Sequence, residues 1–213
     1  MKTLIVSATL KESELLISEF CMRKAFENFF VSDKFHVDLL IAGIGIPATI
    51  FAMFADAQIA NYDFVINVGI AGSFKNSYNL GQIVNVTADR FGDIGLRTKS
   101  GFLPVFESQH NSRYRNLLNN GGVYNTSDYP LHFKNIEKSS GVTVNIPEVK
   151  LYEDVDVETM EGAAFMLVCK YYRKVFVQIR GISNIIGVTD KNDWDFNLSI
   201  RNYTNLIVEF IKR

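Results

Sequence analysis

The chain has 213 residues, 22 Lys and Arg against 23 Asp and Glu, and a formal net charge of -1. This balance excludes a nucleic-acid binder that works through a basic face, and it excludes an acidic disordered tail. With 47% hydrophobic and 21% charged residues, the composition is that of a soluble globular protein, and the length favours a single domain over residues 1–213.

The first part of the chain alternates predicted strands with predicted helices. Short apolar runs predict buried strands over Thr3–Ser7, Phe35–Ala42 and Asp63–Val68. Helical spacing of apolar residues predicts helices over Glu14–Phe29 and Thr49–Ala60, and Pro47 suits the first turn of the second one. Buried strands that alternate with helices indicate an α/β protein, with a mostly parallel sheet and helices on both faces.

The second part is less regular. Further strands are predicted over Gln82–Thr87, Val142–Asn145 and Val175–Arg180. Further helices are predicted over Met160–Tyr172 and Phe196–Lys212. The polar, glycine-bearing stretches Gly92–Pro104 and Gly121–Lys138 are predicted to be long loops, which often carry function in compact domains.

The cysteines, the histidines and the N-terminus predict a reduced, cytoplasmic protein without a metal. Cys21 and Cys169 do not make a disulfide framework, and the three histidines are too far apart for a metal site. The apolar run before Lys11 is too short for a signal peptide, and no stretch reaches the roughly 18 apolar residues of a membrane span. We therefore expect no nucleic-acid partner and no membrane partner.

The segment Gly43-Ile44-Gly45-Ile46-Pro47-Ala48 matches G-x-G-x-x-A between a predicted strand and a predicted helix. In a dinucleotide-binding fold, this turn follows the first strand, and an acidic residue ends the next strand and holds the ribose. Here the turn does not follow the first strand, and the next strand ends in Gly69. A tight strand-to-helix turn is the better interpretation, and a nicotinamide oxidoreductase is a distant alternative.

Three other blocks each allow a structural and a functional interpretation. The strand end Gly69-Ile70-Ala71-Gly72 is either a simple turn or a place where a flat ligand approaches the backbone. In Met160-Glu161-Gly162-Ala163-Ala164, Glu161 either stands at a helix N-terminus because the helix dipole stabilises its negative charge, or accepts hydrogen bonds from the two vicinal hydroxyls of a ribose. The block Arg180-Gly181-Ile182-Ser183-Asn184 either caps a loop or points into the ligand crevice of an α/β sheet.

These blocks occur in order and with suitable spacing, and the chain resembles the superfamily of purine nucleoside phosphorylases and methylthioadenosine/S-adenosylhomocysteine nucleosidases over nearly its whole length. Within it, the chain looks similar to the futalosine hydrolase group of the alternative menaquinone pathway. That match rests on Ala8-Thr9 followed by Glu12, on the run from Ile182 to Trp194, on Asp93-Ile94-Gly95 and on Gly101-Phe102-Leu103-Pro104.

The resemblance implies a three-layer αβα sandwich with a central mixed, mostly parallel sheet. It also implies an enzyme that cleaves the N-glycosidic bond of a purine nucleoside, without a cofactor and as a homodimer. Glu161 would hold the ribose hydroxyls, Met160 would pack against the sugar, and Glu12 would activate water, with Glu14 as its local competitor. Three more residues complete the expected substrate-binding set, namely Ala71, Gly72 and Ser183.

The nucleophile follows from residues that the chain lacks. Phosphorylases of this superfamily carry arginines for phosphate, whereas the first arginine here is Arg23, which lies beyond the loop after the first strand. Asn67 stands two positions before Gly69, where bacterial phosphorylases have an arginine, and Ile70 offers no hydroxyl. A phosphate dianion would lack its bidentate partners, so we expect water as the nucleophile.

The resemblance implies that Asn184 contacts the purine base. Relatives that act on 6-aminopurines carry Asp at this position. An Asn amide can donate to a 6-oxo group while its carbonyl accepts from a protonated N7, but it cannot supply the N7 proton. This favours futalosine, which releases hypoxanthine, over methylthioadenosine, S-adenosylhomocysteine or aminodeoxyfutalosine. A non-catalytic nucleoside-binding homologue is a further alternative.

The 5′ substituent of the substrate is not fixed by these residues. The aromatic residues Phe102 and Phe106 and the segment Tyr124–Phe133 fit the lining of an apolar 5′ pocket. They fit the core or a subunit interface equally well.

Overall fold

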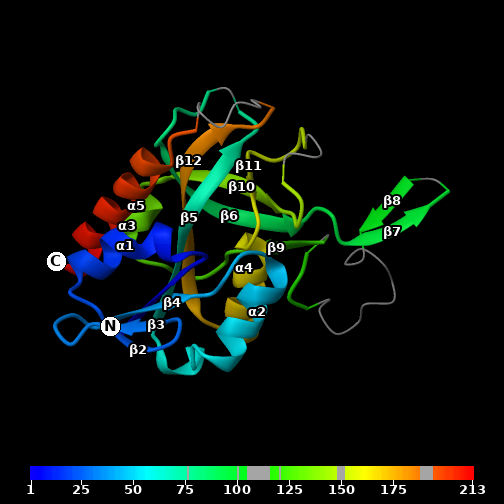
Figure 1. Ribbon diagram of the computed structural model, residues 1–213. Coiled ribbons are helices and arrows are strands. Elements are labelled where there is room, and N and C mark those ends of the chain that lie inside the picture. Colours follow the sequence, from blue (N-terminus) through cyan, green and yellow to red (C-terminus); the bar gives the residue numbers. More distant parts are fainter. Residues whose placement is uncertain (76, 100, 105–115, 120, 148–151, 188–193) are drawn as a thin grey trace.

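The computed structural model describes residues 1–75, 77–99, 101–104, 116–119, 121–147, 152–187 and 194–213. Among these residues, ten strands form one mixed sheet at the centre of the molecule (Figure 1). In chain order these strands are β1 Thr3–Ser7, β2 Arg23–Phe26, β3 Phe29–Val31, β4 Val37–Ile41, β5 Phe64–Ser73, β6 Ile83–Phe91, β9 Gly122–Tyr124, β10 Glu137–Thr143, β11 Val157–Thr159 and β12 Val175–Ile185.

The central strands β4, β1, β5 and β12 lie side by side and run parallel. Antiparallel pairing begins on either side, with β3 against β4 and with β12 against β6. Strand β10 runs parallel to β6 and β11, and β11 also pairs antiparallel with β5. The sheet therefore closes on itself through β5, β12, β6, β10 and β11.

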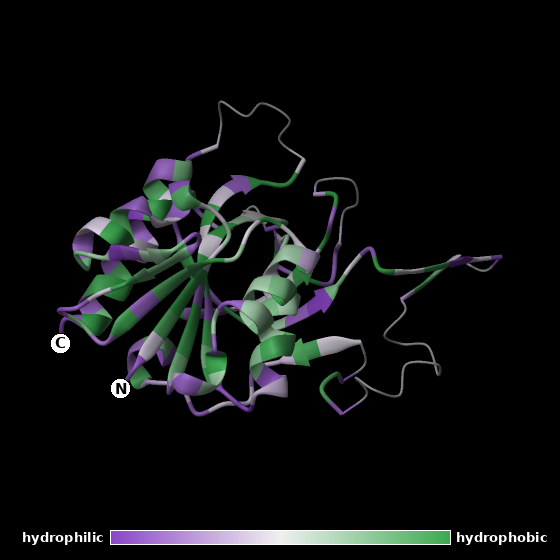
Figure 2. Cartoon of the chain, turned by 60° about the horizontal axis from the view of Figure 1, so that its bottom comes forward, coloured by the Kyte–Doolittle hydropathy of each residue, from purple (hydrophilic) through white to green (hydrophobic). Residues whose placement is uncertain are grey.

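Helices cover both faces of the sheet. One layer holds α1 (Leu10–Glu19), α3 (Leu131–Lys134) and α5 (Phe196–Ile211), and the other holds α2 (Ile46–Ala55) and α4 (Gly162–Tyr171) (Figure 1). Each layer closes its own apolar core against the sheet, and the central strands are mostly hydrophobic along their length (Figure 2). The predicted α/β sandwich with a central mixed sheet is confirmed. No helix among the described residues is long and apolar enough to cross a membrane.

The predicted helix over Glu14–Phe29 is wrong at both ends. Helix α1 starts at Leu10, because Thr9 caps it: the Thr9 hydroxyl accepts the Glu12 N–H at 3.3 Å and donates to the Glu12 carboxylate at 2.7 Å. That is the capping-box pattern, a sequence signal that apolar periodicity alone overlooks. The helix ends at Glu19, and Cys21 follows in the left-handed region with φ 48°. Beyond it, the chain forms the antiparallel pair β2–β3.

The two predicted long loops contain regular structure. The first holds a hairpin of β7 (Gly95–Thr98) and β8 (Gly101–Pro104), which projects from the body of the molecule (Figure 1). Its strands are exposed, so their sequences do not alternate between apolar and polar residues, which is the pattern that predicts a half-buried strand. The second holds β9, α3 and the start of β10.

Strands β5 and β12 are longer than predicted. Each continues through the glycine-bearing block that was expected to end it, because the two strands pair in parallel along their whole length. Inside a central pair, the backbone hydrogen bonds are supplied by the neighbour, so a glycine weakens the strand without ending it. The candidate residues of both blocks therefore belong to the sheet and not to loops.

Candidate active site

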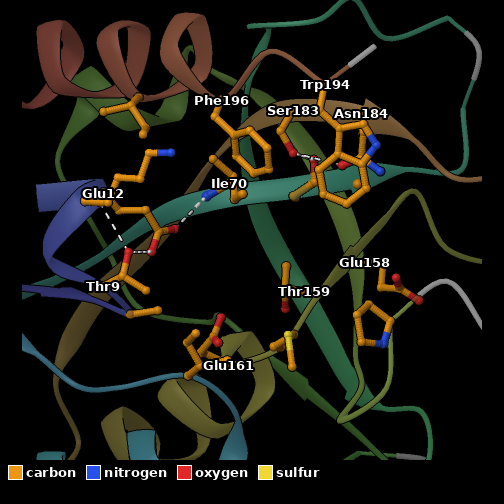
Figure 3. Close-up of a pocket in the computed structure, with 18 of the residues that line it drawn as sticks. Thr9, Glu12, Ile70, Glu158, Thr159, Glu161, Ser183, Asn184, Trp194 and Phe196 are labelled. Carbon is orange, nitrogen blue, oxygen red and sulfur yellow. Dashed lines mark hydrogen bonds between the residues drawn. The ribbon is translucent and has the colours of Figure 1, made fainter. Parts of the chain in front are cut away.

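A pocket lies at the carboxyl ends of the central strands (Figure 3). Residues that follow β1, the last residues of β5 and β12, strand β11 and the turn before α4 form its wall. This is the edge at which open α/β sheets bind ligands. All the predicted site residues line it, namely Glu12, Ala71, Gly72, Met160, Glu161, Ser183 and Asn184.

Glu12 lies in the first turn of α1 and points into the pocket (Figure 3). Its Oε2 accepts from Thr9 Oγ1 at 2.7 Å, and its Oε1 accepts from the Ile70 N–H at 3.3 Å. The buried Tyr203 on α5 anchors this turn, because its hydroxyl donates to the Glu12 carbonyl oxygen at 2.6 Å. Glu14 is exposed and does not line the pocket, so of the two carboxylates only Glu12 can meet a ligand there.

Arg180 is a buried cation beside Glu12, and sequence reasoning gave it no role. Its side chain is 1% exposed, and its Nη2 donates to Asn67 Oδ1. Gly69 leaves room for both charges, since a Cβ there would collide with Arg180 Nη1 and lie 3.1 Å from Glu12 Oε1. The available signal was an arginine at the end of an otherwise apolar buried strand, where unpaired charge is rarely tolerated.

Glu161 is the N-cap residue of α4 and is largely buried. Its Oε1 accepts the Gly45 N–H at 2.9 Å. Burial raises the pKa of Glu161, while the charge of Arg180 and the Gly45 hydrogen bond act against that rise. Gly43 and Gly45 adopt φ values of 87° and 89°, which favour glycine. The G-x-G pattern is therefore the strand-to-helix turn that we predicted, and it has the additional role of holding Glu161.

A second buried carboxyl group, Asp89, lies behind the start of α4. Its Oδ1 accepts from Thr143 Oγ1 and its Oδ2 accepts from Gln178 Nε2, both at 3.0 Å. The Thr143 hydroxyl in turn accepts the Ala163 N–H at 2.7 Å, so the network supports the first turn of α4. Burial raises the pKa of Asp89 to about 6, against the opposing effect of the Gln178 and Thr143 hydrogen bonds.

Asn184 reaches the pocket through an irregularity in β12. The register between β12 and β5 shifts between Ile182 and Asn184, so Ser183 occupies an extra position and Asn184 faces Gly72. The Ser183 hydroxyl donates to Asn184 Oδ1 at 2.9 Å. The amide nitrogen lies above Gly72, where an added Cβ would be 3.1 Å from Asn184 Nδ2. This adds to our expectation: the amide oxygen accepts from Ser183, and the amide nitrogen is the atom that lies next to Gly72.

Aromatic side chains that the sequence left without a role form another part of the wall. Trp194 and Phe196 both line the pocket, with ring centroids 5.3 Å apart and planes tilted by 41° (Figure 3). Such rings offer apolar surfaces on which a flat ligand can stack. Trp194 ends the run from Ile182 that carried part of the resemblance, and Phe196 lies two residues further on.

The aromatic segments that were candidates for a 5′ pocket have other positions, as far as the structure describes them. Tyr129 and Phe133 belong to the core under α5. Phe102 lies on the exposed β7–β8 hairpin, and neither it nor Tyr124 lines the pocket. Phe106 lies outside the described residues. The core interpretation therefore holds for the segment around Phe133.

The fold and the pocket together define an α/β protein with a carboxylate-rich ligand site at the strand ends. The family model described as "Phosphorylase superfamily" matches residues 2–212, and the chain belongs to this family.

Known proteins agree with this assignment. A futalosine hydrolase of Streptomyces coelicolor is 27% identical over 190 residues, which cover 80% of this chain and 76% of the relative. A 5'-methylthioadenosine/S-adenosylhomocysteine nucleosidase of Bacillus licheniformis is 26% identical over 235 residues, which cover 100% and 99%. The solved structure of the Helicobacter pylori 5'-methylthioadenosine/S-adenosyl homocysteine nucleosidase superposes with a TM-score of 0.76 at 15% identity, covering 100% and 98%, which shows the shared fold. These relatives support the predicted enzyme class, an N-glycosyl hydrolase.

Proposed function

We propose that the protein hydrolyses the N-glycosidic bond of futalosine, giving hypoxanthine and dehypoxanthinyl futalosine in the alternative menaquinone pathway. The observation that carries this proposal is Asn184, whose carbonyl is engaged by Ser183 while its amide nitrogen lies above Gly72. A donor at this place matches the O6 and N7 acceptors of a 6-oxopurine. The similarity to the Streptomyces coelicolor futalosine hydrolase supports the same substrate.

The proposed reaction divides among three groups of this chain. Glu161 accepts hydrogen bonds from the ribose hydroxyls and places negative charge near the developing oxocarbenium ion, with Met160 packed against the sugar. Glu12, oriented by Thr9 and the Ile70 N–H, removes a proton from the water that attacks the anomeric carbon. Asn184 donates to the purine at N7, where charge accumulates as the base leaves.

Water is proposed as the nucleophile because the groups that would bind phosphate are occupied or absent among the described residues around Gly69. Arg180 donates to Asn67 Oδ1, and Asn67 Nδ2 donates to the Val6 carbonyl at 2.9 Å. Ile70 offers its N–H to Glu12 and has no side-chain hydroxyl. The other cation that lines the pocket among the described residues, Lys11, has its ammonium 5.6 Å from the centre of the Phe196 ring, so a phosphate dianion would lack a pair of bidentate arginines here.

The second candidate is a nucleosidase for methylthioadenosine, S-adenosylhomocysteine or aminodeoxyfutalosine. Its support is the nucleosidase of Bacillus licheniformis, which matches the whole chain. A non-catalytic nucleoside-binding homologue is the remaining alternative, and the shared pocket of Glu12 and Glu161 weighs against it.

The test is to incubate the protein with futalosine, methylthioadenosine and inosine, each with and without phosphate, and to quantify the free base by chromatography. We expect hypoxanthine from futalosine at a rate independent of phosphate, with free sugar as the second product. Adenine released faster from methylthioadenosine would favour the second candidate. A sugar 1-phosphate would overturn hydrolysis, and no release of base from any substrate would favour the non-catalytic homologue.

The proposal includes a homodimer, one domain over residues 1–213 and a cytoplasmic location. An exposed apolar face on α2 and the end of α4 supports the dimer: Phe51 is 71% exposed, and the exposed rings of Phe54 and Tyr171 have centroids 5.6 Å apart. A patch of this kind is costly to leave in water, and a second copy would cover it. Light scattering after gel filtration should give twice the 24.1 kDa mass of the chain, and Phe51→Glu should reduce it to the monomer.

A further inference from the structure

Glu161 is an N-cap residue whose side chain does not cap its own helix. A negative charge at a helix N-terminus is attracted to the first N–H groups of that helix. Asp195, the N-cap residue of α5, shows this arrangement, because its carboxylate accepts the Leu198 N–H at 2.9 Å. The Glu161 side chain accepts no N–H of the described first turn of α4, and it turns instead to the Gly45 N–H and into the pocket. Its carboxylate is therefore available to a ligand.

Two threonine hydroxyls accept the N–H groups of α4 in its place. The Gly162 N–H donates to Thr159 Oγ1 at 3.2 Å, and the Ala163 N–H donates to Thr143 Oγ1 at 2.7 Å. Thr143 on β10 pairs with Thr159 on β11, and their hydroxyl oxygens lie 3.2 Å apart. The first two residues of α4 are thus capped by the sheet and not by Glu161.

Asp89 on β6 sets the direction of these two hydroxyls. Burial raises the pKa of Asp89 to about 6, so the carboxyl stays mostly ionised at neutral pH, and in this form it only accepts hydrogen bonds. The single proton of Thr143 Oγ1 is therefore donated to Asp89 Oδ1, at 3.0 Å, and the lone pairs of Thr143 are left for the Ala163 N–H and the Thr159 hydroxyl. Thr159 then donates its proton to Thr143 and keeps a lone pair for the Gly162 N–H.

The chain makes room for the Asp89 carboxylate beside the start of α4. At Gly141, an added Cβ would lie 2.9 Å from Asp89 Oδ2, and at Gly162 it would collide with the same oxygen. The Gln178 amide donates to that oxygen at 3.0 Å, so both carboxylate oxygens are hydrogen-bonded. Asp89 is buried and does not line the pocket. Any effect on a ligand must therefore pass through the groups that Asp89 contacts.

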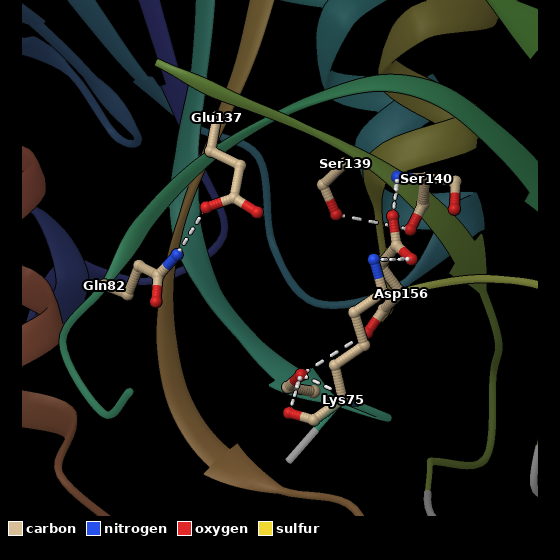
Figure 4. A network of polar contacts seen from close by, with 7 residues as sticks. Lys75, Gln82, Glu137, Ser139, Ser140 and Asp156 are labelled. Atoms are coloured by element: carbon tan, nitrogen blue, oxygen red, sulfur yellow. Dashed lines mark hydrogen bonds and ion pairs between the residues drawn. The ribbon is translucent and has the colours of Figure 1, made fainter. Parts of the chain in front are cut away.

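Strand β11, which carries Thr159, is itself fixed in the sheet. Just before it, Asp156 accepts from the Lys75 ammonium at 2.7 Å and from the Ser140 N–H at 2.8 Å (Figure 4). The Asp156 carbonyl accepts the Phe74 N–H at 2.9 Å. These contacts join β11 to β10 and to the residues that follow β5, so the two capping hydroxyls are held in register by the fold.

We propose that Asp89 is a positioning residue for the sugar: it directs the Thr143 and Thr159 hydroxyls to cap α4, which leaves the Glu161 carboxylate free to bind the ribose. The inference rests on the proposed function in taking the ligand to be a ribonucleoside. Without the hydroxyls, buried N–H groups at the start of α4 would lack an acceptor, which is costly, and they would attract the nearest carboxylate. Glu161 would then be divided between its own helix and the ribose hydroxyls.

Binding of nucleosides that cannot be cleaved tests this role without requiring turnover. The probes are the C-nucleoside analogue of inosine, in which a carbon–carbon bond replaces the glycosidic bond, and its 2′-deoxy form. We would measure both Kd values by calorimetry at neutral pH. The wild type should bind the ribose form about 10- to 150-fold more tightly, the range for a hydrogen bond to a charged group. Thr143→Ser should keep this ratio, whereas Thr143→Val should lower it towards the value near one expected for Glu161→Ala.

Tyr62→Phe is the matched control. It also removes a buried hydroxyl that donates to a carboxylate, here Asp38 at 2.8 Å, and Tyr62 does not line the pocket. Loss of stability alone reduces the folded fraction and weakens the apparent binding of both analogues equally. The control should therefore keep the wild-type ratio, so a lower ratio in Thr143→Val reports on the placement of Glu161.

An unchanged ratio in Thr143→Val, an equal fall in Tyr62→Phe, or a wild type that does not distinguish the two analogues would overturn the assignment. If Thr143→Val does not fold, Asp89→Leu decides by the same ratio, because it removes the acceptor that directs both hydroxyls. A buried charge is often replaced without loss by an apolar side chain of similar volume. The analogues lack any 5′ substituent, so a failure to cleave futalosine would refute the proposed function and leave the role of Asp89 standing.

Discussion

The two ends of the pocket are built in different ways. At the end proposed to hold the sugar, Glu12 lies in the first turn of α1, Glu161 is the N-cap residue of α4, and the buried cation Arg180 lies near both. At the end proposed to hold the base, Asn184 lies on strand β12 and pairs with Gly72 on β5. A ribose is common to all ribonucleosides, whereas bases differ in their pattern of donors and acceptors. The comparison therefore separates residues expected to set the rate from residues expected to set the choice of base.

The sharpest test of the sugar end is Glu12→Gln. The amide cannot take a proton from water, so turnover should fall by ~10²–10⁴-fold, the usual loss for a general base. Substrate should still bind, which equilibrium binding of the nucleoside would show. Glu14→Gln is the matched control and should retain full activity, because Glu14 is exposed outside the pocket. Near-normal turnover of Glu12→Gln would remove this residue from the mechanism.

The next largest effect concerns the ribose hydroxyls. Charged hydrogen bonds contribute ~1.5–3 kcal/mol, so kcat/KM for a 2′-deoxy substrate should be about 10- to 150-fold lower than for the ribonucleoside in the wild type. In Glu161→Ala, the partner of the hydroxyl is gone, and this penalty should be much smaller. The measurement is kcat/KM for both substrates with both proteins. An equal penalty in the two proteins would mean that Glu161 does not hold the 2′-hydroxyl.

At the base end, Asn184→Asp should change the choice and not only the rate. The wild type should prefer a 6-oxo nucleoside over its 6-amino analogue by about 5- to 150-fold, since each unmatched buried group costs roughly 1–3 kcal/mol. An Asp removes the donor and adds a carboxylate that accepts from N6 and can protonate N7. The variant should lose activity on futalosine and gain relative activity on aminodeoxyfutalosine. A ratio of kcat/KM values that does not move would contradict this role for Asn184.

The smallest effect lies behind the sugar end, at Asp89. Its native pKa of about 6 exceeds that of the unfolded chain, so between about pH 4 and pH 6 the native state binds more protons than the unfolded state. The free energy of unfolding therefore falls as pH rises through this window, by at most about 3 kcal/mol from this group.

Asp89→Asn lacks this titration, so its stability curve from urea unfolding should be flatter over the same range. Lys134 lowers the pKa of the exposed Asp128, so Asp128→Asn should not reproduce the flattening. A wild-type curve parallel to that of Asp89→Asn between pH 4 and pH 6 would contradict the prediction.

The features that could be predicted from the sequence are those that leave a local pattern of residues. Long apolar strands and the order of the blocks were enough to predict the layered fold. The resemblance that those blocks carry supplied seven residues that all line the pocket, whereas other residues of its wall, such as Thr159 and Phe196, were not predicted. Arg180 had no assigned role, because its place beside Glu12 depends on strand pairing: Gly69 on the neighbouring strand β5 leaves room for its side chain. Such register is set by contacts between distant segments and leaves no local pattern.

The predicted ends of helix α1 and of strands β5 and β12 were wrong for reasons that can be located in the structure. Apolar residues after Glu19 continue at helical spacing, yet the left-handed Cys21 and the stacked rings of Phe26 and Phe29, with centroids 4.8 Å apart, belong to a hairpin. Glycines at the ends of β5 and β12 suggested turns, because the sequence does not reveal that each strand supplies hydrogen bonds to the other.

The hydrogen bond from Gly45 to Glu161 has a thermodynamic consequence. The N–H belongs to the turn that leads into α2, and α2 carries the exposed Phe51 and Phe54 that a second copy of the chain would cover. Any shift of α2 when two copies of the chain associate would change how the Glu161 carboxylate is held. Coupling of this kind is reciprocal, so a ligand that binds more tightly to the dimer must strengthen the dimer by the same factor. Ligand binding in the pocket and self-association of the chain would then be thermodynamically linked, so that each would change the equilibrium constant of the other.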